Sequence, residues 1–172
     1  MTPPYRSYRT VLRNVAEGLG QRFGFSVGDA EREALGASVA SWRPFPDTVG
    51  ALRALAARYR LALISNIDDD LFTTTAPQLG VSFDCVVTAQ GARCYKPEQA
   101  IFELAHGRVG VKGHQVAHIA EGVTEISPAR RLGCATVWVR RRGRSARLLI
   151  EALDLEVPDL SSLLPHVGID AS

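Results

Sequence analysis

Four short apolar runs, separated by stretches with helical character, constrain the fold of this chain more than any other feature. The runs are predicted to be strands and span residues 61–66, 85–89, 116–120 and 135–139. The stretches between them are predicted to be helices over residues 69–79, 97–109 and 127–132, and a last short helix is predicted over 159–167. Strands that alternate with helices form a mostly parallel sheet with right-handed crossovers. The sequence therefore predicts an α/β fold.

The N-terminal part has a different pattern. A helix is predicted from Tyr5 to Phe23, with an apolar stripe formed by Val11, Leu12, Val15, Leu19 and Phe23. A second helix reaches about Val39, and a third begins after Asp47 or Thr48, either of which is expected to cap it. We therefore expect a helical segment over residues 1–46 and an α/β core over residues 47–172.

Composition limits the classes of function. The net charge of +2 is too weak to argue for a nucleic-acid partner, and no apolar run has the length of a membrane span. Three cysteines without CxxC spacing suit reduced thiols in a cytoplasmic protein, and the histidines show no metal-ligand spacing. The basic run from Arg140 to Arg144 could bind phosphate or an acidic partner, or it could be a solvated loop.

Polar side chains follow three of the predicted strands. Ser65 and Asn66 end the first strand, Lys96 follows the second, and Glu121 and Glu125 follow the third. The carboxyl ends of parallel strands meet at one edge of a sheet, where ligands bind in open α/β folds. A lysine beside carboxylates at that edge could hold an anion or a polarised oxygen.

Each of these residues also has a purely structural interpretation. Ser65 and Asn66 could simply turn the chain, and Asp68, Asp69 and Asp70 are expected at the N-cap and in the first turn of the next helix. The two glutamates could cap a helix and pair with Arg130 or Arg131, and Lys96 could be a surface residue. His118 lies mid-strand, as a core histidine would. The aromatic residues near the connection between the two parts either line a pocket or pack a hinge: Tyr5, Tyr8, Trp42 and Phe45.

Several segments together carry a family resemblance. They are Pro44 to Leu52, Leu63 to Asn66, Tyr95 to Glu98 with Phe102 downstream, His118 to Glu121, Glu125 to Gly133, and Thr136 to Val139. With these segments the chain resembles the haloacid dehalogenase-like (HAD) superfamily, and more closely its L-2-haloacid dehalogenase branch. The resemblance covers nearly the whole chain and implies a Rossmannoid parallel sheet, with helices on both faces and a small helical cap at the N-terminus. It implies a hydrogen-bonding role for Ser65 with Asn66 beside it, and makes Lys96 the lysine that steadies the nucleophile and the bound anion.

The chain also departs from the family pattern. The family's nucleophile is an aspartate at the end of the first core strand, and no apolar strand ending in aspartate precedes Tyr5. Residues 120–125 also look one residue short, although Glu125 stands near the family's acidic position. We therefore expect that the central first strand is missing and that covalent hydrolysis is lost. The free edges could pair directly, be filled by rebuilt N-terminal residues, or take a strand from another chain, and we expect a homodimer.

Three functions remain open. The leading hypothesis is a small-molecule enzyme that performs non-hydrolytic acid/base chemistry on an organic acid or acyl substrate, without a metal or cofactor. Its catalytic residues would be Lys96, Glu121 and Glu125. Its substrate-binding residues would be Ser65, Asn66, Asp69, Tyr5, Tyr8 and Trp42. The alternatives are a residual haloacid dehalogenase or phosphatase, and a non-catalytic protein that binds a partner through its strand edges.

Overall fold

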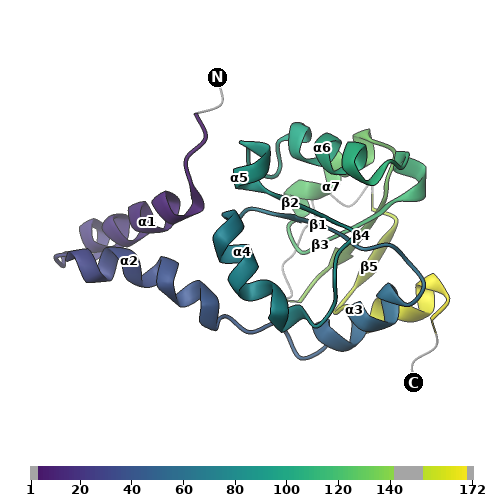
Figure 1. The fold of residues 1–172 in the computed structure, drawn as a ribbon, viewed down its shortest axis with the longest axis horizontal. Coiled ribbons are helices and arrows are strands. Elements are labelled where there is room, and N and C mark those ends of the chain that lie inside the picture. Colours follow the sequence, from purple (N-terminus) through teal and green to yellow (C-terminus); the bar gives the residue numbers. More distant parts are fainter. Residues whose placement is uncertain (1–3, 142–152, 170–172) are drawn as a thin grey trace.

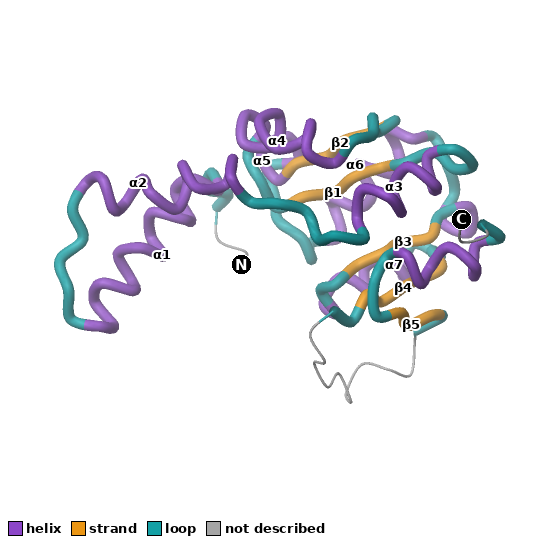
Figure 2. Tube along the Cα trace, turned by 90° about the horizontal axis from the view of Figure 1, so that it is seen from below, coloured by secondary structure: helices purple, strands orange, loops and turns teal. Residues whose placement is uncertain are grey.

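Five parallel strands, arranged as two separate sheets, form the centre of the fold (Figures 1 and 2). The computed structural model describes residues 4–141 and 153–169. The first sheet pairs β1 (Ala62–Ser65) with β2 (Cys85–Thr88). The second has the order β3 (Ala117–Ala120), β4 (Ala135–Val139) and β5 (Leu155–Val157). The four predicted strands are confirmed to within two residues at each end, whereas β5 was not predicted.

Helices alternate with the strands, as the predicted α/β fold requires. The α-helices are α1 (Tyr8–Phe23), α2 (Asp29–Ser38), α3 (Thr48–Ala56), α4 (Asp69–Thr75), α5 (Ala89–Ala92), α6 (Gln99–Val109) and α7 (Ile126–Arg131). Short 3-10 helices are η1 (Val39–Ser41), η2 (Ala76–Leu79), η3 (Gly113–Gln115), η4 (Val123–Glu125) and η6 (Ser161–Val167). No helix in the described part of the chain is both long and apolar enough to cross a membrane.

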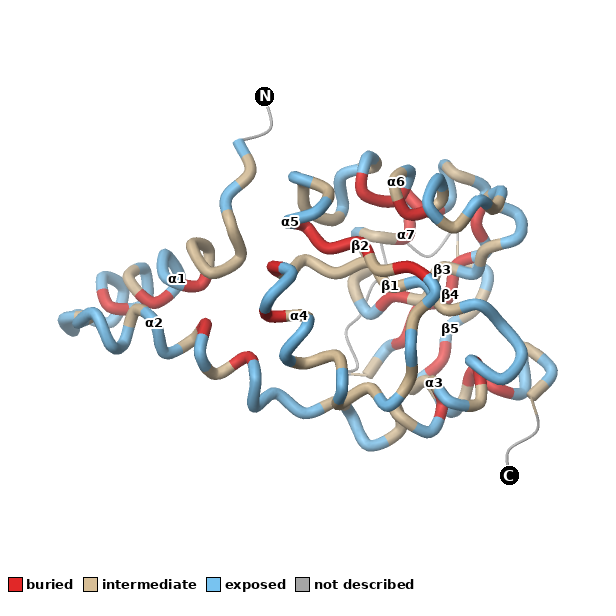
Figure 3. The backbone as a smooth tube through the Cα atoms, in the orientation of Figure 1, coloured by how far each residue is buried: buried red, intermediate tan, exposed pale blue. Residues whose placement is uncertain are grey.

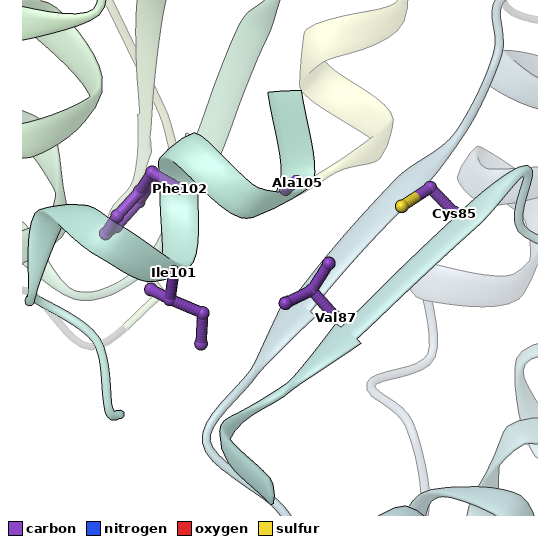
Figure 4. Packing of buried hydrophobic residues seen from close by; sticks show 5 residues of the cluster. All are labelled: Cys85, Val87, Ile101, Phe102 and Ala105. Atoms are coloured by element: carbon purple, nitrogen blue, oxygen red, sulfur yellow. The ribbon is translucent and has the colours of Figure 1, made fainter. Parts of the chain in front are cut away.

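Each sheet has its own covering helix. α6 packs on β1 and β2, and α7 packs on β3 and β4. Val87 from β2 and two α6 residues, Ile101 and Phe102, are almost completely buried at the first of these contacts (Figure 4). α3 and η6 pack against each other on the opposite side of the strands (Figure 1). The helices therefore hold together two sheets that share no strand pairing within residues 4–141 and 153–169.

The two central strands are the least covered. Among the described residues, β1 pairs only with β2 and β3 only with β4, so one edge of each strand has no strand partner (Figure 2). No residue of β1 is buried, whereas three of four in β2 and four of five in β4 are (Figure 3). In an ordinary sheet the central strands are the most buried. Direct pairing of β1 with β3, one of the expected ways to close the sheet, is not found in the described part of the chain.

The N-terminal helices form a hairpin that projects from the strands and their covering helices (Figure 1). Leu12 of α1 and Val39 of η1 are buried against Leu71 of α4, which attaches the hairpin. The apolar stripe predicted for α1 is only partly buried, because Leu12 is buried whereas Leu19 is 41% and Phe23 is 68% exposed. The buried residues of α1 also include Ala16 and Gly20, and α1 packs on α2. Periodicity alone does not show which face of a helix is covered. The division of the chain at residue 46 stays a prediction.

Asp68 joins the hairpin to the end of β1. It occupies the N-cap position of α4, but its side chain makes no capping bond there. Instead its carboxylate accepts hydrogen bonds from the backbone N–H groups of Tyr8 at 2.8 Å and Arg9 at 3.0 Å, and from the Tyr5 hydroxyl at 3.1 Å. The buried carboxylate therefore caps α1, where free N–H groups and the helix dipole favour a negative charge. The expected local role of Asp68 is thus replaced by a long-range one.

Asp47 makes a second long-range connection. Its side chain makes no capping bond to α3 and instead forms a two-pronged ion pair with Arg141, with N–O distances of 2.7 and 2.8 Å. It also accepts a hydrogen bond from the Leu160 backbone N–H. The hydrogen bond from Arg141 lowers the pKa of Asp47 despite burial. Arg140, next in the basic run, pairs with Glu156, and the rest of that run lies outside the described residues.

Candidate active site

The carboxyl ends of β2 and β3 bring a lysine and a glutamate from different sheets into contact. Lys96 precedes α6 and Glu125 ends η4, and the Lys96 Nζ atom lies 3.1 Å from Glu125 Oε2. Their side chains are only 17% and 16% exposed. Ion pairs that are shielded from water interact more strongly than surface pairs, provided that their geometry compensates for lost hydration. Two of the three predicted catalytic residues are therefore close together.

The Asn66 side chain holds the backbone of Lys96 in place. Its Oδ1 atom accepts a hydrogen bond from the Lys96 N–H at 2.7 Å, and its Nδ2 group donates one to the Lys96 carbonyl at 3.1 Å. This amide therefore uses both its donor and its acceptor on one residue. Ser65 is half-buried at the end of β1, and its hydroxyl makes no hydrogen bond to another described residue.

His118 also contacts Glu125. Its Nε2 atom lies 3.4 Å from Glu125 Oε2, and its side chain is 13% exposed. The Phe102 ring meets the imidazole edge-on, with ring centroids 5.2 Å apart. The mid-strand position predicted a core histidine, and nothing in the residue pattern indicated that this histidine would reach the Glu125 carboxylate. Residues 118 and 125 are separated by the end of β3 and a turn. The path of the backbone through that turn cannot be predicted from the spacing of the two residues.

Glu125 is held in its ionised form. Burial alone would raise the pKa of Glu125, but the contacts of its carboxylate with His118 and Lys96 outweigh burial and lower it below its ordinary value of 4.5. A carboxylate with a lowered pKa is a weak base at neutral pH. The arrangement therefore suits Glu125 for orienting Lys96 and balancing its charge better than for proton transfer.

The lowered pKa predicts how the Glu125 contribution to stability depends on pH. The unfolded chain binds the Glu125 proton at a higher pH than the folded chain, so this stabilisation is present above about pH 4.5 and is lost as the pH falls through the folded pKa. We expect Glu125→Gln to be less stable than the native chain by about 1–3 kcal/mol at pH 7, with a gap that narrows towards pH 3. Urea unfolding at several pH values measures this gap. A gap that is constant with pH would contradict the assignment.

Glycine at position 122 leaves room for the Glu125 carboxylate. A Cβ atom built on Gly122 would lie 3.0 Å from Glu125 Oε1, closer than most real Cβ contacts. Because Oε2 is held by Lys96 and His118, the carboxylate has little freedom to move away. We expect Gly122→Ala to lower any Lys96-dependent activity by roughly tenfold, the size of a 1.4 kcal/mol perturbation. Steady-state kinetics tests this, with Gly50→Ala as a control where a Cβ meets nothing within 4 Å. Equal activities would show that the Glu125 position is not critical.

Glu121 does not join this cluster. Its side chain is exposed, and its backbone carbonyl accepts a hydrogen bond from Trp138 Nε1 at 3.0 Å. Asp69 is exposed too, and its carboxylate accepts a hydrogen bond from the Thr88 hydroxyl. Among the described residues, Lys96 forms an ion pair with Glu125 and with neither Glu121 nor Asp69. The expected pair of carboxylates beside the lysine is therefore reduced to Glu125.

The three aromatic candidates do not line one common pocket. Tyr5 stacks on Tyr95 at 5.6 Å and lies under the Arg93 guanidinium. These three residues line a hollow of about 750 Å³ between the start of α1 and the loop that leads to Lys96. Tyr8 does not line it, and Trp42 is 50% exposed with its Nε1 bonded to Ser38. Lys96 itself does not line the hollow, although its sequence neighbours do.

No three His, Cys, Asp or Glu side chains among residues 4–141 and 153–169 are grouped as a metal site would require. The expectation of a site without metal or cofactor stays a prediction.

Comparisons with known proteins agree with this architecture. A family model described as haloacid dehalogenase-like hydrolase matches residues 4–133. Haloacetate dehalogenase H-2 of Moraxella sp. (strain B) is 28% identical over 130 residues, which are 74% of this chain and 58% of that protein. (S)-2-haloacid dehalogenase 4A of Burkholderia cepacia is 28% identical over 124 residues, which are 70% and 54% of the two chains. The crystal structure of the L-2-haloacid dehalogenase PA0810 matches with a TM-score of 0.84 at 26% identity, over 96% of this chain and 76% of that chain.

Because the family model matches well over half of the chain, this protein belongs to the haloacid dehalogenase-like hydrolase family. The relatives and the solved structure support the L-2-haloacid dehalogenase-like branch and the Rossmannoid fold expected from the sequence. The chain spans about half the length of the curated relatives it matches. The expected loss of the nucleophilic aspartate stays a prediction.

Proposed function

We propose that this chain contributes the charge-stabilising part of a hydrolytic site for a small 2-halogenated carboxylic acid. The observation that carries the proposal is the shielded Lys96–Glu125 ion pair at the carboxyl ends of β2 and β3. Relatives named as haloacetate and (S)-2-haloacid dehalogenases support the substrate class. Hydrolysis rather than non-hydrolytic acid/base chemistry is favoured, because Glu121 is exposed and Glu125 has a lowered pKa.

The proposed reaction replaces halogen by hydroxyl. The carbon–halogen bond breaks, the halide leaves with the electron pair, and the carbon gains an oxygen that comes from water, with one proton released. Lys96 provides a positive charge for the anion, either the halide or the substrate carboxylate. A preorganised positive charge in a site shielded from water needs little rearrangement as negative charge develops. Glu125 and the two hydrogen bonds of Asn66 set where that charge lies.

The experiment is a measurement of halide and phosphate release by the purified 172-residue chain. Chloroacetate, both enantiomers of 2-chloropropionate, and a set of phosphate esters provide the substrates. The proposal expects halide release with a preference for one enantiomer, and little phosphate release. Release of phosphate alone would identify a phosphatase, and release of neither would reject a hydrolytic function for this chain.

A second function is favoured by a different observation. Lys96 and His118 are two titratable side chains that both contact the Glu125 carboxylate, so three groups that could take part in proton transfer with a small organic acid lie together. This function corresponds to acid/base chemistry without a covalent intermediate. Exchange of the Cα proton of propionate or lactate for deuterium, followed by NMR, detects it. Exchange without any halide release would favour this function over dehalogenation.

A partner strand is proposed for the free edges of β1 and β3. β1 is parallel to β2 and β3 is parallel to β4, and each of β1 and β3 has one edge without a strand partner among the described residues. β1 also contains no buried residue. Unpaired strand edges readily accept another strand. The proposed source is a second copy of the chain, which makes the protein a homodimer. Light scattering over a concentration series, with amide exchange of Leu63 and Ile119, tests this. A monomer whose β1 and β3 amides exchange rapidly would reject the homodimer.

A further inference from the structure

One buried polar atom beside the Lys96–Glu125 pair lacks an ordinary partner. The Nε2 atom of His118 is shielded from solvent and makes no hydrogen bond of normal geometry to any described residue. Its nearest opposite charge is Glu125 Oε2, at 3.4 Å, which is longer than a typical N–H···O bond. Buried polar groups are nearly always hydrogen-bonded, so an exception calls for an explanation. The contact at 3.4 Å is close enough for a strong electrostatic interaction.

The groups around His118 come from each element that packs on it. Glu125 lies at the end of η4 and Lys96 lies before α6. His106 comes from α6, and its Nε2 atom lies 3.5 Å from the Cys134 sulfur. Burial, with a smaller contribution from His118, lowers the pKa of His106, and burial raises the pKa of the Cys134 thiol. Both shifts favour the neutral forms of His106 and Cys134.

The charge of the cluster depends on the protonation of His118. Lys96 and Glu125 together carry no net charge, because their opposite charges meet at Oε2. Protonation of His118 adds a positive charge at the same oxygen, and the cluster then carries a net charge of +1. The carboxylate is then shared between two cations, so the ammonium of Lys96 is less neutralised. Such a change in charge has a large electrostatic effect in a site shielded from water, since the surrounding dielectric constant is lower than that of water.

We infer that His118 controls the affinity of the Lys96 site for small carboxylate anions, with tight binding when His118 is protonated and weak binding when it is neutral. His118 is a positioning residue, since it acts through Glu125 and Lys96. The effect on turnover rests on the proposed dehalogenation, whereas the effect on anion binding does not. By linkage, binding of the anion takes up a proton.

Binding of propionate, which carries no halogen to release, isolates this step. Isothermal titration between pH 5.5 and 8 is expected to show about a tenfold loss of affinity for the native chain as the pH rises, the effect of roughly 1.4 kcal/mol of charge interaction. His118→Gln, which keeps an N–H donor but never gains a charge, is expected to bind with an affinity that does not change with pH. His114→Gln, an exposed histidine on η3, serves as the control and should behave like the native chain.

Proton uptake provides a test that needs no variant. Titrations near pH 6.5 in two buffers of different ionisation enthalpy measure the protons bound with propionate, and we expect a substantial fraction of one proton. Absence of proton uptake, or an unchanged pH dependence in a folded His118→Gln, would overturn the inference. If His118→Gln is insoluble, the buffer experiment alone decides. If these tests reject the role of His118 but halide release still depends on Lys96, the proposed dehalogenase function is retained.

Discussion

Replacing Lys96 with methionine is expected to lower halide release by about 100-fold or more, the usual effect of removing one preorganised charge or donor from a reacting centre. The methionine side chain keeps most of the apolar stem of lysine but has no ammonium. It leaves the Glu125 carboxylate, only 16% exposed, without its closest cation. The loss should fall on kcat, because the charge is needed most when the anion departs.

Lys112→Met is the matched control. Lys96 and Lys112 are the two lysines of the chain, and Lys112 is exposed at the start of η3. We expect its kinetics to equal those of the native chain, and circular dichroism should show both variants folded. A folded Lys96→Met with unchanged turnover would remove Lys96 from the site and would contradict the proposed function.

Replacing Asp68 with alanine is expected to destabilise the protein by about 2–4 kcal/mol, because hydrogen bonds to charged groups contribute about 1.5–3 kcal/mol each and act together here. The carboxylate is 3% exposed and holds the first turn of α1 against the end of β1. For a chain of this size, the midpoint of thermal unfolding should fall by roughly 5–15 °C. Thermal unfolding followed by circular dichroism measures the change.

Asp70→Ala separates this effect from the loss of an aspartate in general. Asp70 pairs with Arg9, but both side chains are largely exposed, and such pairs contribute about 0–1 kcal/mol. We expect a shift of a few degrees at most. If the two variants were equally stable, Asp68 would not anchor α1, and the attachment of the hairpin would depend mainly on the apolar contact of Leu12 and Val39 with Leu71.

The sequence predicted the parallel α/β arrangement because apolar strands and helices alternate visibly over residues 61–139. It also predicted that Lys96 and Glu125 meet, since the carboxyl ends of parallel strands converge at one edge whatever the intervening loops do. The same rule wrongly grouped Glu121 with them. A residue directly after a strand can point to either side, and Glu121 is exposed while its backbone carbonyl accepts a bond from Trp138.

The contacts that the sequence could not predict are long-range ones. Asp68 caps a helix that begins 60 residues earlier, and Asp47 pairs with Arg141, 94 residues later. Both aspartates stand where a local helix cap is expected, and local preference gives no indication of a distant partner. The exposure of Leu19 and Phe23 has a similar cause. Apolar periodicity predicts a helix face but does not identify what covers it.

The most direct test of the account is a crystal structure of this chain grown with propionate at slightly acidic pH. The account predicts that the carboxylate binds at the carboxyl ends of β2 and β3, within hydrogen-bonding distance of Lys96 Nζ, with Glu125 still in contact with the lysine. A ligand bound instead in the hollow lined by Tyr5, Arg93 and Tyr95, with Lys96 and Glu125 unchanged, would contradict it.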